Sequence, residues 1–345
     1  MIKNQIIILK NDAVGDLVHS LNAIDNIIRN HTGHKIIIYL SERSKKFSFL
    51  IKGKNIEFKF VKYRLNISEK FNLFFSLFNN SIKKIYILSP KLFYFYLPIF
   101  FLRKKFYAIC LNGLDKYKRP NIFLRKFLTK YVINDRSAKY KRPSTKDIQI
   151  SLTEIVSSKI QQKYFFENKN YFLNKYLQME YAYFHIKSQT IKKLGWSDND
   201  IYLLFNEILK FHKNIFVTRD IEDLIIKKDY AFNYNKVDLK TLNLNKSDNN
   251  IYLFDNIEGE DLFNLINNSK KVIAFHGMMT NLASLNYKKV LDLFFCEINN
   301  YKQYAQYRNS FYEFKPSYNG YDFTIPSKDI SKTLQKIQFS INDKK

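Results

Sequence analysis

The stretch QIIILKNDAVGDLVHSLNAIDNIIRN (residues 5–30) decides the expected fold class of this chain. The apolar run within 5–9 is typical of a strand that is buried on both faces, as in parallel sheets. A short polar loop, 10–16, follows it. From 17 to 29 the apolar residues then recur at helical spacing. A strand, a tight loop and a helix in this order are the first unit of an α/β fold.

The same alternation continues along the chain in two sets. The first set has expected strands at 35–40, 56–61, 84–88 and 105–110, with helices near 43–51, 69–79 and 91–102. The second set has expected strands at 181–186, 214–218, 251–254, 271–275 and 289–294, with helices at 198–211, 260–268 and 279–286. Such alternation favours parallel sheets. The predicted fold class is therefore α/β, with two Rossmann-like domains built on mainly parallel sheets.

The length of 345 residues agrees with about two domains at roughly 150 residues each. We expect an N-terminal domain over 1–175 and a C-terminal domain over 176–326. The remainder, 327–345, is predicted to hold a tail helix, and a return of this helix to the N-terminal domain is one alternative. An Asn- and Lys-rich segment, 233–250, is interpreted as a surface loop.

The chain carries a large excess of positive charge, with 57 Lys and Arg against 31 Asp and Glu, a formal net charge of +26. Such a charge is typical of partners that are nucleic acids or anionic membranes. A bias toward AT-rich codons is an equal alternative, because Lys, Asn, Ile, Phe and Tyr are all abundant. Eleven basic residues and one acid gather in a basic segment, 116–146, whose aromatic residues keep single-strand binding open as an alternative.

No segment resembles a membrane span or a secretory leader. The most apolar stretch, Leu92–Leu102, has eleven residues and contains Pro98, whereas a spanning helix needs about 20. The four apolar residues 6–9 are too few for the apolar core of a leader peptide. We therefore expect a cytoplasmic protein that binds at most peripherally to the inner face of the membrane.

The loop after the first strand is the first candidate site. Gly15 and Asp16 stand where a strand gives way to a helix, at the edge where open α/β sheets bind ligands. Asp16 can act as a general base toward a hydroxyl group, or it can cap the helix electrostatically. The loop lacks the further glycines of a dinucleotide fingerprint.

A second candidate site follows the expected strand at 271–275. The segment His276-Gly277-Met278-Met279-Thr280-Asn281 begins a helix, and free N–H groups at a helix start can cradle a phosphate. Thr280 and Asn281 can contact the ligand or cap the helix. Local spacing alone leaves both possibilities open.

Together these loops resemble the motifs of glycosyltransferase family 9, the heptosyltransferases of lipopolysaccharide core synthesis. Gly15-Asp16 and His19 match the N-terminal Gly-Asp and His of that family, and Asn22 stands where the family usually has Pro. The segment VIAFHGMMTNLASL (272–285) resembles the Asp-Thr-Gly motif that precedes His-Leu-Ala-Ala. Here His276-Gly277-Met278 replaces Asp-Thr-Gly, and Asn281 replaces His. The resemblance covers about 1–30 and 181–295, including AYFHI (182–186) and KKLGW (192–196).

The resemblance implies a GT-B fold, in which two Rossmann-like domains face a central cleft and no metal or other cofactor is required. A nucleotide-sugar donor would bind the C-terminal domain through Lys192, Lys193, His276, Gly277, Met278, Met279, Thr280 and Asn281. The acceptor would lie near Asn11, Gly15, His19, Arg119 and Arg125 on the N-terminal domain. Asp16 would remove the acceptor's proton in an inverting displacement. The replacement of the family's Asp by His276 implies altered donor recognition.

The predicted function is a metal-independent glycosyltransferase with a nucleotide-sugar as co-substrate. Its acceptor would be an anionic glycolipid or saccharide of the lipopolysaccharide, O-antigen or capsule type. Two alternatives stay open at this point. One is a basic nucleic-acid-binding protein, and the other is a glycosyltransferase-like protein without catalytic activity.

Overall fold

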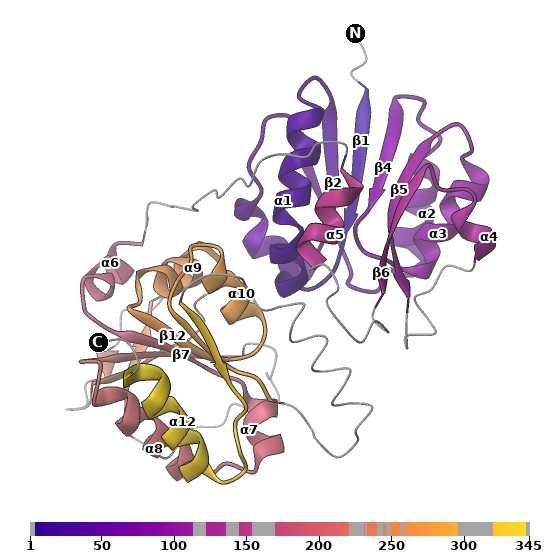
Figure 1. Ribbon diagram of the computed structural model, residues 1–345. Helices are drawn as coiled ribbons and strands as arrows, with labels where there is room; N and C mark the ends of the chain where they lie inside the picture. The colour runs from indigo at the N-terminus through magenta and orange to yellow at the C-terminus, as the bar shows by residue number, and fades with distance from the viewer. Residues whose placement is uncertain are drawn as a thin grey trace. The chain divides into compact units, whose positions relative to one another are not determined.

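A computed structural model describes two compact units, each with its own sheet (Figure 1). The first unit lies within 4–153 and the second within 170–342. The described residues are 4–112, 122–135, 145–153, 170–220, 231, 233–239, 244–245, 250–255, 257, 259–295 and 320–342.

The first unit contains a sheet of six parallel strands in the order β3-β2-β1-β4-β5-β6. The strands are β1 (Gln5–Lys10), β2 (Lys35–Ser41), β3 (Ile56–Val61), β4 (Ile82–Ile87), β5 (Lys105–Asn112) and β6 (Lys130–Asp135). The strand order reverses between β1 and β4. Loops leave the sheet in opposite directions at such a switch point and open a crevice at the carboxyl ends of the strands.

Helices cover both faces of this first sheet. They are α1 (Val14–Asn30), the 3-10 helix η1 (Glu42–Leu50), α2 (Ile67–Ser76), α3 (Leu92–Phe100), α4 (Ile122–Arg125) and α5 (Thr145–Leu152). Figure 1 shows α1 and α5 on one face and α2, α3 and α4 on the other. The N-terminus of α2 is closed by a capping box, in which Asn66 and Glu69 exchange side-chain and backbone hydrogen bonds.

The second unit contains a sheet of eight strands in the order β10-β9-β11-β8-β7-β12-β13-β14. They are β7 (Ala182–Ile186), β8 (Ile215–Arg219), β9 (Asn235–Asp238), β10 (Leu244–Asn245), β11 (Ile251–Asp255), β12 (Lys271–Phe275), β13 (Val290–Leu293) and β14 (Tyr321–Thr324). All neighbours are parallel except β10, which pairs antiparallel with β9.

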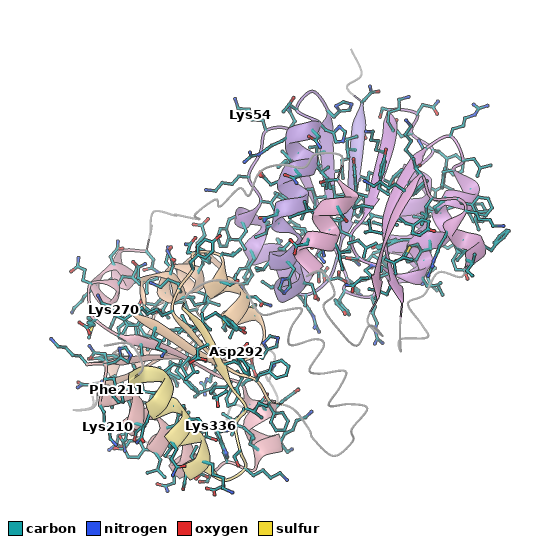
Figure 2. The ribbon with its side chains drawn as sticks, viewed as in Figure 1. Lys54, Lys210, Phe211, Lys270, Asp292 and Lys336 are labelled. Atoms are coloured by element: carbon teal, nitrogen blue, oxygen red, sulfur yellow. The ribbon has the colours of Figure 1, made fainter. Side chains whose placement is uncertain are left out.

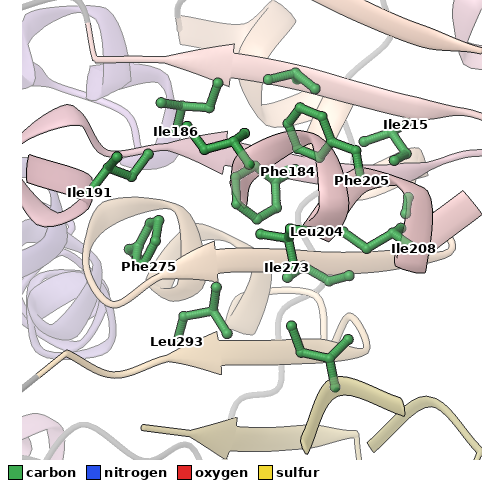
Figure 3. Packing of buried hydrophobic residues seen from close by; sticks show 14 of the residues in the cluster. Phe184, Ile186, Ile191, Leu204, Phe205, Ile208, Ile215, Ile273, Phe275 and Leu293 are labelled. Atoms are coloured by element: carbon green, nitrogen blue, oxygen red, sulfur yellow. The ribbon is translucent and has the colours of Figure 1, made fainter. Parts of the chain in front are cut away.

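The helices of the second unit again form two layers. They are α6 (Tyr171–Leu177), α7 (Ser188–Leu194), α8 (Asp198–Leu209), α9 (Gly259–Asn268), α10 (Met278–Ser284) and α12 (Ile330–Asn342). Figure 3 shows the core beneath one layer, where Phe184 and Ile273 from the strands meet Leu204 and Phe205 of α8. Phe184 and Phe205 pack edge to face, with ring centroids 5.3 Å apart.

The structure confirms the α/β fold class and the two mainly parallel sheets. It differs from the sequence interpretation in the strands β6, β9 and β10 and in the start of the second unit. The expected surface loop 233–250 contains β9 and β10, since Val237 is buried and continues the sheet. Helix α6 packs against α9, so the second unit begins before residue 176.

Helix α12 belongs to the second unit, whereas the sequence left its return to the N-terminal domain as one alternative. Ile330 and Ile337 are buried in the second core. The Gln338 Nε2 group donates a hydrogen bond of 2.9 Å to Glu207 Oε1 of α8. The preceding turn is held as well, since Trp196 Nε1 donates to the Ser327 carbonyl at 3.0 Å.

Candidate functional site

A cavity of about 440 Å³ lies in the first unit at the switch point of its sheet. Its walls come from the end of β1, from the segments that follow β1, β3 and β4, and from α1, α2, α3, α5, β5 and β6. The lining residues are Lys10, Asp12, Asp16, Tyr63, Arg64, Leu65, Lys70, Leu88, Pro90, Lys91, Phe93, Ile109, Leu111, Asn134 and Gln149. Four cations, two carboxylates and several apolar side chains suit a polar or anionic ligand.

A buried ion pair forms one side of this cavity. Lys10 Nζ lies 2.9 Å from Asp12 Oδ2, and the Ser89 hydroxyl donates to the same carboxylate at 2.6 Å. Burial alone raises the pKa of the Asp12 carboxyl, but Lys10, Ser89 and Lys91 outweigh burial and hold this pKa below its ordinary value. Asp12 therefore stays ionised and joins the end of β1 to the end of β4.

Lys91 crosses the same region from the loop after β4. Its ammonium donates to the Asn11 carbonyl at 2.9 Å and also to the Tyr63 carbonyl, and it lies 4.5 Å from the centroid of the Tyr63 ring. Burial, the largest influence, lowers the pKa of Lys91 to about 8, although Asp12 and Asp16 act in the opposite direction. Lys91 is a cation whose charge can change under mildly alkaline conditions.

Asp16 lies in the first turn of α1, is exposed and lines the cavity. The N-cap of α1 is Ala13, without a side-chain hydrogen bond, so Asp16 is not the cap residue. A carboxylate in this turn still interacts favourably with the helix dipole. Asp16 can therefore both stabilise α1 and contact a ligand in the cavity.

Asn11, a predicted acceptor-side residue, is fully buried. Its Nδ2 donates to the Lys62 carbonyl at 3.1 Å, and its Oδ1 accepts from the Tyr94 hydroxyl at 2.8 Å. The side chain therefore joins the loops after β1 and β3 to α3. The side chain has a structural role, and its predicted contact with the acceptor stays a prediction.

The other predicted acceptor-side residues are dispersed. Gly15 and His19 lie on α1 and are partly buried. Arg125 ends α4, with its guanidinium 5.9 Å from the Tyr131 ring, and does not line the cavity. Arg119 lies outside the described residues, as do 116–121 and 136–144 of the basic segment.

In the second unit, β12 is followed by the turn His276-Gly277 and by α10. Gly277 has φ 152° and ψ −140°, a conformation in which a Cβ atom is strained. The Lys187 ammonium donates to the His276 carbonyl at 3.1 Å and would lie 3.6 Å from a Cβ at Gly277. Lys187, which directly follows β7, thus presents a cation to this turn.

The His276 ring is held from the neighbouring strand. Its Nδ1 lies 2.6 Å from Asp292 Oδ2 of β13, and Asp292 is fully buried. The Tyr321 hydroxyl of β14 donates to the same carboxylate oxygen. Asp292 is labelled within the second unit in Figure 2. A carboxylate at Nδ1 fixes the ring orientation.

The remaining predicted donor residues are less suited than Lys187 to contact a ligand at this turn. Thr280 is buried, and its hydroxyl accepts from Gly277 N and donates to the Gly277 carbonyl, so it serves as a cap. Met279 and Asn281 are also buried, whereas Met278 is partly exposed. Lys192 and Lys193 are exposed in the last turn of α7. The sequence interpretation missed Lys187, although its position directly after a strand was a usable signal.

A second polar group lies at the carboxyl ends of β7, β8 and β11. His185 contacts the Thr218 hydroxyl through Nδ1 at 2.9 Å and Asp220 through Nε2 at 3.0 Å. Arg219 forms two hydrogen bonds with Asp255, of 2.9 and 3.0 Å, and this fork is a strong, oriented pair. These side chains are mutually engaged at the ligand-binding edge of the sheet.

Several solved structures share this architecture. Glycosyltransferase family 9 from Veillonella parvula has a TM-score of 0.60 at 12% identity, over 85% of this chain and 80% of that chain. The ADP-heptose lipopolysaccharide heptosyltransferase II of E. coli has a TM-score of 0.61 at 10% identity, over 98% and 99%. The chain has the GT-B fold.

The fold is also shared with a UDP-GlcNAc 2-epimerase from Methanocaldococcus jannaschii. That structure has a TM-score of 0.55 at 11% identity, over 99% of this chain and 93% of that chain. No family model and no curated protein sequence matches the chain significantly. At these identities the likeness establishes the fold alone.

The described residues hold neither a cluster of metal-ligating side chains nor a membrane-spanning helix. They contain no group of three His, Cys, Asp or Glu side chains placed to hold a metal ion. None of the helices described is long and apolar enough to cross a bilayer. Metal-independence and peripheral membrane binding stay predictions.

Proposed function

We propose that the chain is a glycosyltransferase that moves a sugar from a nucleotide-sugar donor to a saccharide acceptor. The acceptor class would be lipopolysaccharide, O-antigen or capsule. The cavity at the switch point of the first sheet carries this proposal, because it combines the exposed carboxylate of Asp16 with cations. A glycosyl acceptor needs a base for its hydroxyl proton and contacts for its polar groups.

In the proposed reaction Asp16 accepts the proton of an acceptor hydroxyl. The acceptor oxygen forms a bond to the anomeric carbon as the bond from that carbon to the donor's phosphate oxygen breaks. The nucleoside diphosphate leaves with the electron pair of the broken bond, and attack from the opposite side inverts the anomeric configuration. Asp12, already paired with Lys10 and Ser89, is less suited to the role of base.

The second unit would bind the donor at the His276-Gly277 turn. Lys187 is the cation on this turn, so we assign to it the contact with donor phosphates that the sequence resemblance placed on Lys192 or Lys193. A cation there offsets the charge that develops on the departing diphosphate. A related E. coli heptosyltransferase was solved with ADP, at a TM-score of 0.55, which supports a nucleotide diphosphate as the donor's leaving part.

A thermal-shift screen against nucleoside diphosphates and nucleotide-sugars tests the donor class. A ligand that binds only the folded state raises Tm by mass action. We expect one nucleotide to raise Tm, and the Lys187→Ala variant to weaken its binding about 10- to 100-fold, the range of a lost charge-assisted contact. Lys192→Ala is the matched control and should bind as the wild type does.

If Lys192→Ala weakened nucleotide binding and Lys187→Ala did not, the phosphate contact would be assigned to Lys192. No Tm response to any nucleotide would contradict the donor proposal. Since 2-epimerases share the fold, a product assay should follow the donor sugar. Transfer to an acceptor supports the proposal, whereas rearrangement of the free donor sugar contradicts it. Tight binding of RNA or DNA with a steep salt dependence would favour the nucleic-acid alternative.

A further inference from the structure

The outer sides of α2 and α3 carry large apolar side chains that face solvent. On α2 and just beyond it they recur at helical spacing, as they do on α3, so each helix presents one apolar stripe. We call these residues the aromatic face, and each is between 41% and 73% exposed: Ile67, Phe71, Phe75, Phe78, Leu92, Tyr96, Phe100 and Leu102. Single exposed apolar residues are ordinary, whereas a contiguous group marks an interaction surface.

Ring contacts join Phe71, Phe75 and Phe78 of the aromatic face and connect them to Phe100. Phe75 contacts Phe71 and Phe78 with centroids 6.2 and 6.3 Å apart. Phe74, partly buried between the helices, contacts Phe100 of α3 at 5.5 Å. Figure 1 shows α2 and α3 together on the same face of the first sheet. The apolar stripes of two helices therefore form one surface.

The segment that carries this face is rich in basic residues, of which Arg64, Lys70 and Lys91 line the cavity. Residues 58–112 contain ten Lys and Arg and one acid, Glu69, whose carboxylate is engaged in the capping box of α2. Lys83, Arg103 and Lys105 are exposed. The turn that carries Arg103 adjoins the end of α2, because Lys104 Nζ donates to the Asn79 carbonyl at 2.8 Å. Cations thus border the apolar side chains.

We propose that the aromatic face docks on the surface of an anionic lipid bilayer. Aromatic side chains enter the boundary between headgroups and acyl chains, while neighbouring Lys and Arg are attracted to anionic lipids. A second copy of this chain is a poorer occupant, because two surfaces of the same positive charge repel one another. The net charge of +26 likewise favours an anionic bilayer over a second copy of the chain.

The same helices also border the cavity of the first unit. Lys70 of α2 and Phe93 of α3 line it, and each is adjacent in sequence to a residue of the aromatic face. An acceptor anchored in the bilayer by its lipid would therefore reach the cavity along this edge. This last step rests on the proposed function, whereas bilayer docking itself is independent of it.

Vesicle co-sedimentation tests the docking without donor or acceptor. Phosphatidylcholine vesicles are compared with vesicles containing 30% phosphatidylglycerol, at low and at high salt. We expect the full chain to bind the anionic vesicles and to lose binding at high salt, where charge is screened. The Phe71→Ser, Phe75→Ser, Phe78→Ser triple variant should bind at least tenfold more weakly.

A matched control replaces exposed apolar residues of the second unit, Phe172→Ser with Leu203→Ser, 43% and 40% exposed, and should bind like the wild type. Circular dichroism verifies that each variant is folded. Absence of wild-type binding, or equal binding by the triple and control variants, would overturn the proposal. So would a dimer that the triple substitution alone dissociates. Turnover of a lipid-free acceptor is measured separately, so failure of docking is distinguishable from failure of the transferase proposal.

Discussion

The carboxyl edges of the two sheets are built from similar strand-loop-helix units but use their polar residues differently. At the first edge Lys10, Asp12 and Ser89 hold one another, while Asp16 is exposed toward a cavity. At the second edge Asp292 holds His276, and Thr280 closes its own turn. The first edge is therefore suited to proton transfer, and the second offers a cation and backbone groups to an anion.

The strongest test of this comparison is the Asp16→Asn variant. If Asp16 is the general base, kcat should fall about 10²- to 10⁴-fold, while nucleotide binding to the second unit stays near the wild-type value. Steady-state kinetics together with the thermal-shift assay measure the two effects. Asp25→Asn, on the same helix, is the matched control, because its surface pair with Arg29 at 3.0 Å contributes about 0.3–0.5 kcal/mol. Wild-type turnover by Asp16→Asn would refute the assignment.

A second test concerns the backbone of the second edge. Gly277→Ala places a Cβ at φ 152°, which we expect to lower the free energy of unfolding by about 1–3 kcal/mol. Urea unfolding measures this loss. Gly33→Ala is the control, since a Cβ there meets no atom within 4 Å, and it should change stability by less than about 0.5 kcal/mol. Equal effects at both glycines would show that the turn is not strained.

The smallest expected effect is the pH dependence of stability at Lys91. Its pKa in the folded chain is about 8, below the ordinary 10.5, so between these pH values the unfolded chain binds more protons. The free energy of unfolding therefore rises with pH in this window, by about 1 kcal/mol once solvent screening is allowed for. Lys91→Met should remove this rise in urea unfolding at about pH 8 and pH 10.

The matched control for the pH test is Lys62→Met, which changes an exposed side chain of the same region. This variant should keep the wild-type rise in stability. If both variants lose it, or neither does, the pH dependence does not originate at Lys91. The test thereby asks whether the partly buried ammonium of Lys91 is the source of the pH dependence.

Much of the fold could be predicted from local pattern. The stretch 5–30 contains its own strand, loop and helix, so β1 and α1 needed no distant information. β6 was missed within the basic segment, because Tyr131 and Ile133 are 43% exposed on an edge strand and give no clear buried pattern. β9 and β10 were missed because they are only four and two residues long.

The candidate site depends on distant contacts more than the fold does. Asp16 could be proposed as a base from the sequence, because its loop follows directly from the strand pattern. Lys187 was not singled out, since its proposed role depends on a contact with a turn 89 residues away. The burial of Asn11 could not be predicted, because a polar residue in a loop gives no sign of burial until its partners on two other segments are known.

Asn11 has one further consequence for binding. Its amide bonds to the Lys62 carbonyl and to the Tyr94 hydroxyl, so the segments after β1 and β3 are fastened to α3. The walls of the cavity therefore have a fixed conformation before a ligand binds. Little ordering entropy is lost on association, and more of the contact energy is expressed as affinity. Asn11 thus acts as a tie that preorganises the first unit.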